Sequence, residues 1–104
     1  MNLDLTKTVF YARGKTDLKK AVEEVVDSGL DAESRNRLFR LSNQIHSAKG
    51  SIELDSSEVE LLMKCVERNA LDPWAYGSLC YLIQPEKMAE SDRAIFEKRY
   101  TEGE

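Results

Sequence analysis

The segment "PWAYGSLCYLIQP", residues 73 to 85, constrains the fold more than any other part of this sequence. Asp72 followed by Pro73 is a typical helix start, with a capping carboxylate and then a proline at the first helical position. Pro85 ends the helix. Nearly all side chains between the prolines are apolar, and a helix without a polar face is usually buried at the centre of a domain. Gly77 costs such a helix about 1 kcal/mol relative to alanine, so we interpret it as the point where a neighbouring helix approaches closely.

Other amphipathic segments are available to cover this helix. Apolar side chains recur with helical spacing, and caps or glycines bound each stretch. The expected helices lie between residues 16 and 29, between 31 and 50, and over 58–69, 73–84 and about 91–100. We place caps at Thr16, Asp31 and Ser57, the last of these in a capping box with Glu60. The short link at residues 28–31 predicts that the first two helices fold back as neighbours.

One short β pair fits beside the helices. Residues 6–12 are rich in β-branched and aromatic side chains, which favour a strand, and residues 51–54 are the most available partner for it. We therefore predict a mainly α fold: a compact bundle of four to five helices, with room for one two-stranded β pair of residues 6–12 with 51–54. A single domain spans residues 1–104, with a charged and partly frayed C-terminal segment. The expected core consists of Leu18, Val22, Val25, Leu38, Leu41, Ile45, Val59, Leu62, Val66, Leu79 and Leu82.

The charge is distributed unevenly along the chain. Residues 1–50 carry nine Lys and Arg against seven Asp and Glu, whereas residues 51–104 carry six against twelve. This asymmetry is typical of two solvated faces of one domain. It also fits a molecule that self-associates head to tail, or that docks on a charged partner.

The sequence predicts a cytoplasmic protein without a membrane segment. Residues 1–14 lack the basic region and apolar stretch of a secretory signal, and no apolar run approaches the roughly 18 residues of a membrane helix. The two cysteines, Cys65 and Cys80, are too few for a disulfide scaffold, and their spacing matches no metal or redox motif.

No residue pattern indicates a catalytic centre. His46 is the one histidine of the chain, and Ser42 and Gly50, four residues to either side, supply no metal ligand. Cys65 and Cys80 lie on expected helices, where a thiol usually behaves as a small hydrophobic group. The five glycines are scattered and form no phosphate-binding loop. We therefore expect a protein that is not an enzyme, with no catalytic residues, no cofactor and no bound metal.

The aromatic side chains exceed what so small a core requires. Three Phe, four Tyr and one Trp occur in 104 residues, and the surplus is expected at an interface, where Trp, Tyr and Arg are enriched. The predicted function is a non-enzymatic interaction protein that self-associates, binds and modulates a larger protein, or does both, with a homo-oligomer expected. The candidate interface residues are Phe10, Tyr11, Arg35, Arg37, Phe39, Arg40, Trp74 and Tyr76.

Nucleic-acid binding is an alternative function. Residues 73–84 contain no Lys or Arg and so cannot form a recognition helix. The second expected helix is better suited because it carries Arg35, Arg37 and Arg40, although a sequence pI near 5.1 disfavours polyanion binding. A small-ligand or nucleotide-binding oligomer is a further alternative. It would need the basic helices of several subunits to converge.

Residues 37–83 resemble small helical accessory proteins of tailed bacteriophages. In that pattern a helix ends in an "I-H-x-A"-like turn, which is followed by an "ELxxEE"-like cap, an apolar helix and a "P-x-x-x-G"-like final helix. The matching residues here are Ile45, His46, Ala48, Glu53, Leu54, Glu58, Pro73 and Gly77. This chain departs from the pattern in its longer, charged C-terminal segment. The resemblance implies a phage-type context, and it transfers no catalytic residue.

Overall fold

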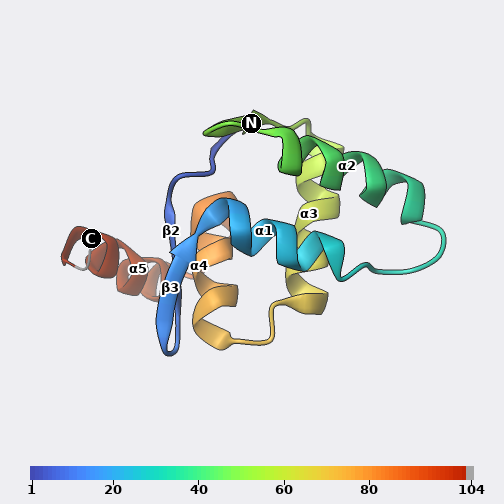
Figure 1. Cartoon of the computed structure of the whole chain (residues 1–104). Helices are drawn as coiled ribbons and strands as arrows, with labels where there is room; N and C mark the ends of the chain where they lie inside the picture. The colour runs from blue at the N-terminus through green and yellow to red at the C-terminus, as the bar shows by residue number, and fades with distance from the viewer. Residues whose placement is uncertain (103–104) are drawn as a thin grey trace.

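The computed structural model describes residues 1–102, and within this range the fold is mainly α, as predicted (Figure 1). In chain order the elements are β1 (Asn2–Asp4), β2 (Thr8–Tyr11), β3 (Gly14–Asp17), α1 (Leu18–Asp27), α2 (Arg35–Ser47), β4 (Ser51–Glu53), α3 (Ser56–Asn69), α4 (Pro73–Ile83), the 3-10 helix η1 (Pro85–Lys87) and α5 (Glu90–Glu102). Among these residues, no helix combines the length and the hydrophobicity needed to cross a membrane.

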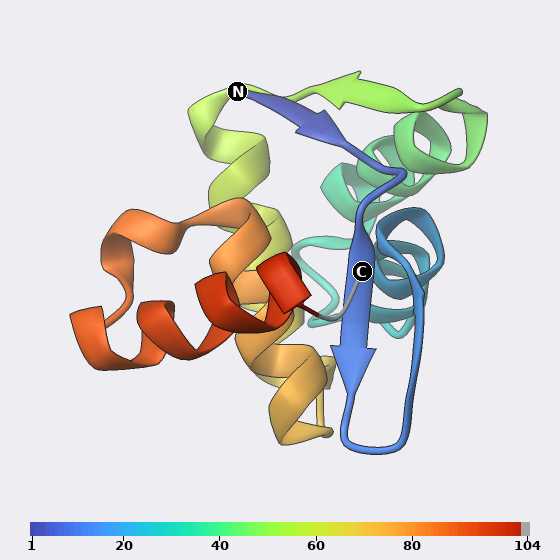
Figure 2. The ribbon, with the colours of Figure 1, turned by 90° about the vertical axis from the view of Figure 1, so that its left-hand side faces the viewer.

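Helix α4 occupies the middle of the fold, in agreement with its apolar sequence. It packs against α3 on one side, against β2 on another and against α5 on a third (Figure 2). Its buried side chains are those of Ala75, Ser78, Leu79 and Ile83. The enclosure is incomplete, however, because Trp74 remains 36% exposed and Tyr76 remains 40% exposed.

Both predicted strands form, but each has a different partner from the one expected. Thr8–Tyr11 pairs with Gly14–Asp17, whereas Ser51–Glu53 pairs with Asn2–Asp4, and both pairs are antiparallel. Gly14 has a φ of +123°, a conformation that glycine adopts at little cost, and it lets the chain reverse over two residues. Closing so short a loop costs less entropy than joining segments some 40 residues apart. Strand β3 therefore pairs with β2 in the place where residues 51–54 were expected.

Two of the expected helix caps are shifted along the chain. Asp17, not Thr16, caps α1, because Thr16 lies in β3 opposite Val9. The capping box of α3 consists of Asp55 and Glu58, two residues before the predicted pair, with the Asp55 carboxylate accepting from the Glu58 backbone N–H at 2.8 Å. An aspartate and a serine close together compete for the cap, and sequence alone does not separate them.

The start of α2 also differs from the prediction. Asp31 accepts a hydrogen bond from the backbone N–H of Ser34 at 2.8 Å, and this turn precedes a helix that begins at Arg35. The start of α4 at Asp72 and Pro73 is confirmed. The terminal helix begins one residue before the predicted Ser91 and continues to Glu102.

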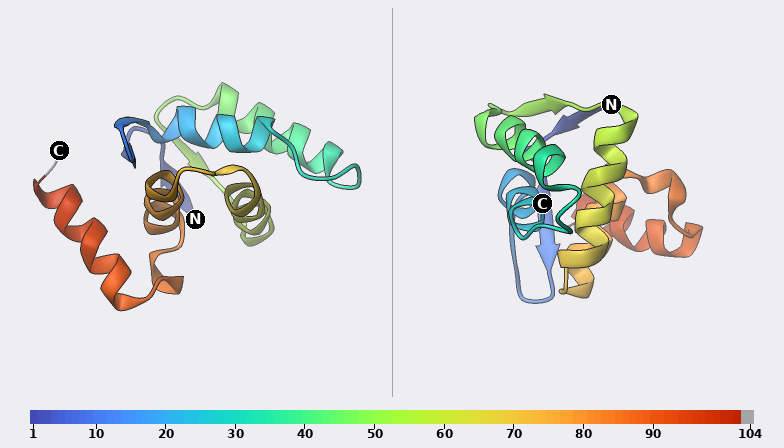
Figure 3. Two further views of the ribbon diagram at one scale, coloured as in Figure 1. Left: turned by 90° about the horizontal axis from the view of Figure 1, so that it is seen from below. Right: turned by 90° about the vertical axis from the view of Figure 1, so that its right-hand side faces the viewer.

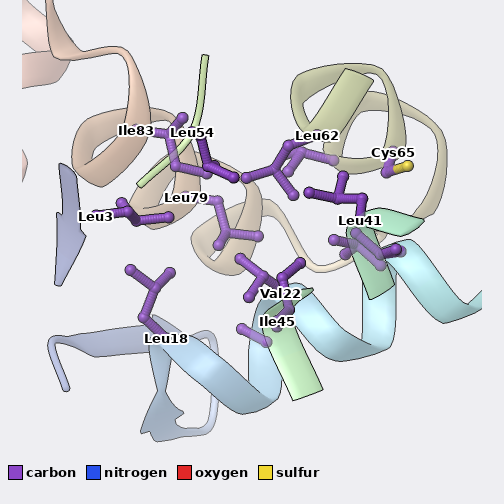
Figure 4. Packing of buried hydrophobic residues seen from close by; sticks show 14 of the residues in the cluster. Leu3, Leu18, Val22, Leu41, Ile45, Leu54, Leu62, Cys65, Leu79 and Ile83 are labelled. Carbon is purple, nitrogen blue, oxygen red and sulfur yellow. The ribbon is translucent and has the colours of Figure 1, made fainter. Parts of the chain in front are cut away.

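The hydrophobic core lies between α1, α2, α3 and α4, and the strands close one end of it (Figure 4). All but one of the predicted core residues are buried; Leu82 is half-buried and packs against the cluster from outside. The strands contribute Leu3, Val9 and Ile52 to the core. The helical spacing of apolar residues does not predict these three.

Candidate functional site

A groove of about 540 Å³ lies between α4 and α5 and is bordered by α3 and η1. Its volume falls within the roughly 300–1,000 Å³ that is usual for binding pockets. Figure 3 shows how α5 turns away from α4 after η1, so that the two helices diverge. The lining is mainly apolar and aromatic, and comprises Met63, Glu67, Pro73, Trp74, Tyr76, Gly77, Cys80, Gln84, Lys87, Met88, Ala89, Asp92, Ile95 and Phe96.

The N-terminus of α4 is fixed by Asp72, and this places Trp74 at the groove. The Asp72 carboxylate accepts from the backbone N–H groups of Trp74 at 2.9 Å and Ala75 at 3.2 Å. It also accepts from the backbone N–H of Ala12, at 3.1 Å for its closer oxygen, in the turn between β2 and β3. One side chain therefore ties the helix start to the hairpin, which gives the wall of the groove a defined position.

The floor of the groove depends on a close approach at Gly77. A Cβ atom on Gly77 would lie 2.5 Å from Cζ and 2.7 Å from Cε2 of Phe96, far inside normal contact distance. Only glycine therefore admits the Phe96 ring in this position. The close helix approach predicted at Gly77 is confirmed, and α5 is the helix that approaches.

Aromatic contacts hold α5 against the body of the protein. The Phe96 ring centroid lies 5.5 Å from that of Trp74 in an edge-on arrangement and 6.0 Å from that of Tyr81. Tyr100 stacks on Tyr81 at 5.4 Å, and its hydroxyl donates to the carbonyl of Thr8. These contacts fasten α5 to both α4 and β2. Each aromatic pair contributes about 0.5–1.5 kcal/mol beyond the burial of its area.

Gly77→Ala is expected to release α5 while leaving the rest of the fold in place. Alanine favours the α4 helix by about 1 kcal/mol, which offsets part of the loss when Phe96 is displaced. We expect backbone amides of residues 90–102 to exchange with solvent at least about tenfold faster, the effect of losing about 1.4 kcal/mol. Hydrogen exchange measured by mass spectrometry checks this. Phe96→Ala should produce the same change, and unaltered protection of α5 in both variants would contradict it.

The cysteine thiols are poorly suited to nucleophilic chemistry. Burial raises the pKa of Cys65 to about 11, and burial is also the main cause that raises the pKa of Cys80, which lines the groove. Both thiols are therefore protonated at neutral pH, whereas the thiolate is the reactive form. Among residues 1–102, no group of three or more His, Cys, Asp and Glu side chains is arranged to hold a metal ion.

The predicted interface residues do not form one surface. Trp74 and Tyr76 line the groove. Phe10 is only 3% exposed, since the Tyr100 ring packs on it at 4.9 Å and the Arg99 guanidinium lies 4.6 Å from its centroid. The expectation that Phe10 is left over for a partner is therefore not met. Tyr11 is half-buried and lies beside Glu24, outside the groove.

The other predicted interface residues lie together on α2. Arg35, Arg37 and Arg40 are exposed, and Phe39 between them is 72% exposed. This α2 face, defined as Arg35, Arg37, Phe39 and Arg40, lies at the opposite end of the molecule from α5 (Figure 1). Six of the eight predicted residues therefore lie in the groove or on α2, two surfaces that do not touch, whereas Phe10 and Tyr11 belong to neither.

Comparisons with protein families, with curated proteins and with solved structures gave no match to this chain. The resemblance to phage accessory proteins stays a prediction.

A polar cluster joins α1 and α2 around His46. Nδ1 of His46 lies 2.8 Å from Glu23 Oε2, and Nε2 lies 2.8 Å from Asp27 Oδ2. Ser42 donates to Asp27 at 2.6 Å. Both ring nitrogens of His46 are therefore engaged by carboxylates of α1. The cluster is therefore a fastening between two helices.

Sequence reasoning considered only neighbours of His46 on its own helix, and so it missed this cluster. The carboxylates come from α1, where Glu23 and Asp27 lie one turn apart on a single face. The expected pairing of the first two helices, combined with that spacing, was the signal that could have revealed it.

The cluster predicts a loss of stability in acid. Partial burial raises the pKa of Asp27, but hydrogen bonds from Ser42 and His46 and the charge of His46 outweigh it, so the pKa lies below its ordinary value of 3.8. A carboxylate with a lowered pKa stabilises the fold above its unfolded-state pKa, and this contribution is lost as the pH falls through the folded-state pKa. Asp27→Asn should therefore unfold at a lower urea concentration than wild type at pH 6.

The difference between Asp27→Asn and wild type should shrink as the pH falls below about 4, because wild type then loses the same charge. Glu53→Gln, at an exposed position of β4, serves as the control and should track wild type throughout. A constant gap between Asp27→Asn and wild type from pH 6 to pH 3 would contradict the prediction.

Proposed function

We propose that this chain is a non-enzymatic interaction protein that binds a protein partner in the groove between α4 and α5. One observation carries the proposal: Trp74, Tyr76 and Ile95 are 36%, 40% and 51% exposed, and all three line the same groove. Scattered exposed apolar residues are common on protein surfaces, whereas several gathered around one hollow mark a binding site. Trp and Tyr in a pocket are also frequent energetic anchors of protein interfaces.

The chemistry of the lining favours a protein over a reacting small molecule. Burial keeps the Cys80 thiol in its protonated form, as its raised pKa indicates, and the imidazole of His46 is occupied on both nitrogens outside the groove. Met63 and Met88 contribute flexible, polarisable side chains that adapt to an apolar partner. These features suit binding of a protein through complementary shape and burial of apolar surface.

Affinity capture with matched variants tests the proposal. Ile95→Ser removes an apolar side chain from the groove, and Leu71→Ser removes one that is 88% exposed and lies outside it. We expect a partner from an extract of expressing cells to be retained by wild type and by Leu71→Ser, and to be lost with Ile95→Ser. Equal retention by both variants would show that binding does not involve the groove.

Binding of the captured protein can be followed through Trp74, which is the single tryptophan of the chain. Occupation of the groove should shift its emission to shorter wavelengths, because the indole loses contact with water. A partner that binds without shifting the Trp74 emission would contradict docking in the groove.

Nucleic-acid binding through the α2 face is the second candidate function. The observation that favours it is that Arg35, Arg37 and Arg40 make no ion pair with any residue the structure describes. Changing all three to Glu should abolish retention on DNA or RNA, and it should flatten the dependence of affinity on salt. Failure of wild type to be retained at low salt would exclude this function.

A further inference from the structure

The α2 face combines one exposed aromatic side chain, Phe39, with three arginines that form no ion pair with any residue the structure describes. Arg35, one turn before Phe39, and Arg40 lie nearest to it on the helix surface, whereas Arg37 points to another side. Helix α2 buries only Leu38, Leu41 and Ile45, so most of its circumference faces solvent. Phe39 is, at 72%, the most exposed aromatic residue of those the structure describes. No Asp or Glu occurs within Arg35–Ser47 to neutralise the three arginines. Such a face suits a partner that offers both an aromatic pocket and carboxylates.

The groove end of the molecule offers this complement. Carboxylates exceed lysines around the groove and around the hollow that adjoins it along α3 and η1. The charged groups lining the two are Glu60, Glu67, Glu86 and Asp92 against Lys64, Lys87 and the N-terminal ammonium of Met1. Lys64 and Glu60 pair with each other at 3.9 Å, so neither contributes to the excess of negative charge. A positively charged side chain therefore approaches this end favourably. The Arg99 guanidinium already lies over the Trp74 ring, 5.3 Å from its centroid, so the Tyr76 ring is the one that can attract a further cation.

The two surfaces cannot meet within one molecule. The longest dimension of the protein is 39 Å, and Figures 1 and 3 place α2 and α5 at opposite ends. Two complementary patches on different parts of one surface generate a heterologous contact between copies. The charge balance along the chain agrees with this arrangement. Residues 1–50, which contain α2, have an excess of positive charge, and residues 51–104, which contain the groove, have an excess of negative charge.

We propose that the occupant of the groove is the α2 face of a second copy of this chain. Phe39 enters the groove beside Trp74 and Ile95, and Arg35 and Arg40 face Glu67 and Asp92. The inference rests on the proposed function, which it deepens by naming the partner. Repeated from copy to copy, this contact builds an open head-to-tail row. Formed twice between the same two copies, with each α2 face in the other copy's groove, it builds a closed antiparallel pair.

Mass measurement across concentration and salt is the first test. At about 100 µM, where a contact with a Kd of micromolar order is largely formed, we expect a mass above the 11.9 kDa of one chain. In about 1 M salt, where the Debye length is roughly 3 Å, the mass should fall toward that of the monomer. Leu71→Ser should associate as wild type does. A clean monomer at low salt overturns the inference.

Mixing two defective variants gives the decisive test. Phe39→Ser with Arg40→Glu damages the α2 face and leaves the groove intact, whereas Trp74→Ala damages the groove and leaves the α2 face intact. Each variant alone should be monomeric. Their mixture should give a one-to-one complex of twice the monomer mass, because one intact groove meets one intact α2 face. If wild type associates but the mixture does not, the contact is of another kind and the inference is overturned.

The Trp74→Ala variant contains no tryptophan, so all tryptophan emission of the mixture comes from the copy whose groove is intact. A shift to shorter wavelengths on mixing then reports that this groove has been filled. Ile95→Ser is the second groove variant if Trp74→Ala fails to fold, with the readout then being mass alone.

The outcomes separate this inference from the proposed function. A wild-type monomer that nevertheless captures a foreign protein through Ile95 overturns self-association and leaves the proposed function standing. Absence of both self-association and groove-dependent capture overturns the two together.

Discussion

Leu79→Ala is expected to lower the free energy of unfolding by about 3–4 kcal/mol, within the range measured for fully buried leucines. Leu79 is 1% exposed and lies in the middle of α4. Figure 4 shows its side chain among those of Leu3, Leu54 and Ile83. Alanine would leave a cavity walled by three different parts of the chain, which cannot collapse without moving several elements. Urea unfolding followed by circular dichroism measures the loss.

The control for Leu79→Ala is Leu71→Ala, at a position 88% exposed. An exposed leucine adds little to stability, so this variant should unfold within about 0.5 kcal/mol of wild type. A loss below about 1 kcal/mol for Leu79→Ala would mean that α4 is not enclosed by the rest of the chain. The central place of α4 in this fold would then be wrong.

Ser78→Ala is expected to cost about 2 kcal/mol although it removes a single oxygen atom. The Ser78 hydroxyl is fully buried, accepts from the backbone N–H of Phe10 at 3.1 Å and donates to the carbonyl of Phe10 at 3.3 Å. Alanine leaves both backbone groups of Phe10 without this partner in a dry environment. Each buried group deprived of its partner costs roughly 1–3 kcal/mol. Differential scanning calorimetry and urea unfolding both measure the effect.

Ser47→Ala provides the comparison for Ser78→Ala, because Ser47 is exposed at the end of α2. It should change stability by less than about 0.5 kcal/mol. Equal stability of Ser78→Ala and wild type would indicate that water or a small backbone shift replaces the hydroxyl. The hydroxyl would then not be what joins α4 to β2.

The helices were predictable because their signals are local. The stripe from Leu18 to Val26 repeats at helical spacing within ten residues, and all of its members are buried. The strand partners were not predictable in this way, since β2 had two possible partners and the choice depended on the turn at Gly14. The cap residues were placed within a few positions, because Asp17 and Asp55 compete with neighbouring hydroxyls that are almost equally suitable.

The candidate site was only partly predictable. Trp74 and Tyr76 were identified as surplus aromatics, but Ile95 and Met63 join them only because η1 sets the direction in which α5 leaves α4. Gly77 was the one sequence feature that indicated the close approach of α5 to α4. Phe10 was misjudged because the side chain that covers it, Tyr100, comes from the far end of the sequence. No pattern of neighbouring residues reports such a contact.

The hydroxyl of Ser78 has one further consequence for the hairpin. A strand at the border of a sheet normally presents unsatisfied amide and carbonyl groups, onto which a strand from another molecule can add. At Phe10 a helix side chain has taken both groups, so this border of β2 is closed to intermolecular strand addition. This border of β2 is therefore protected from the runaway sheet growth that leads to amyloid.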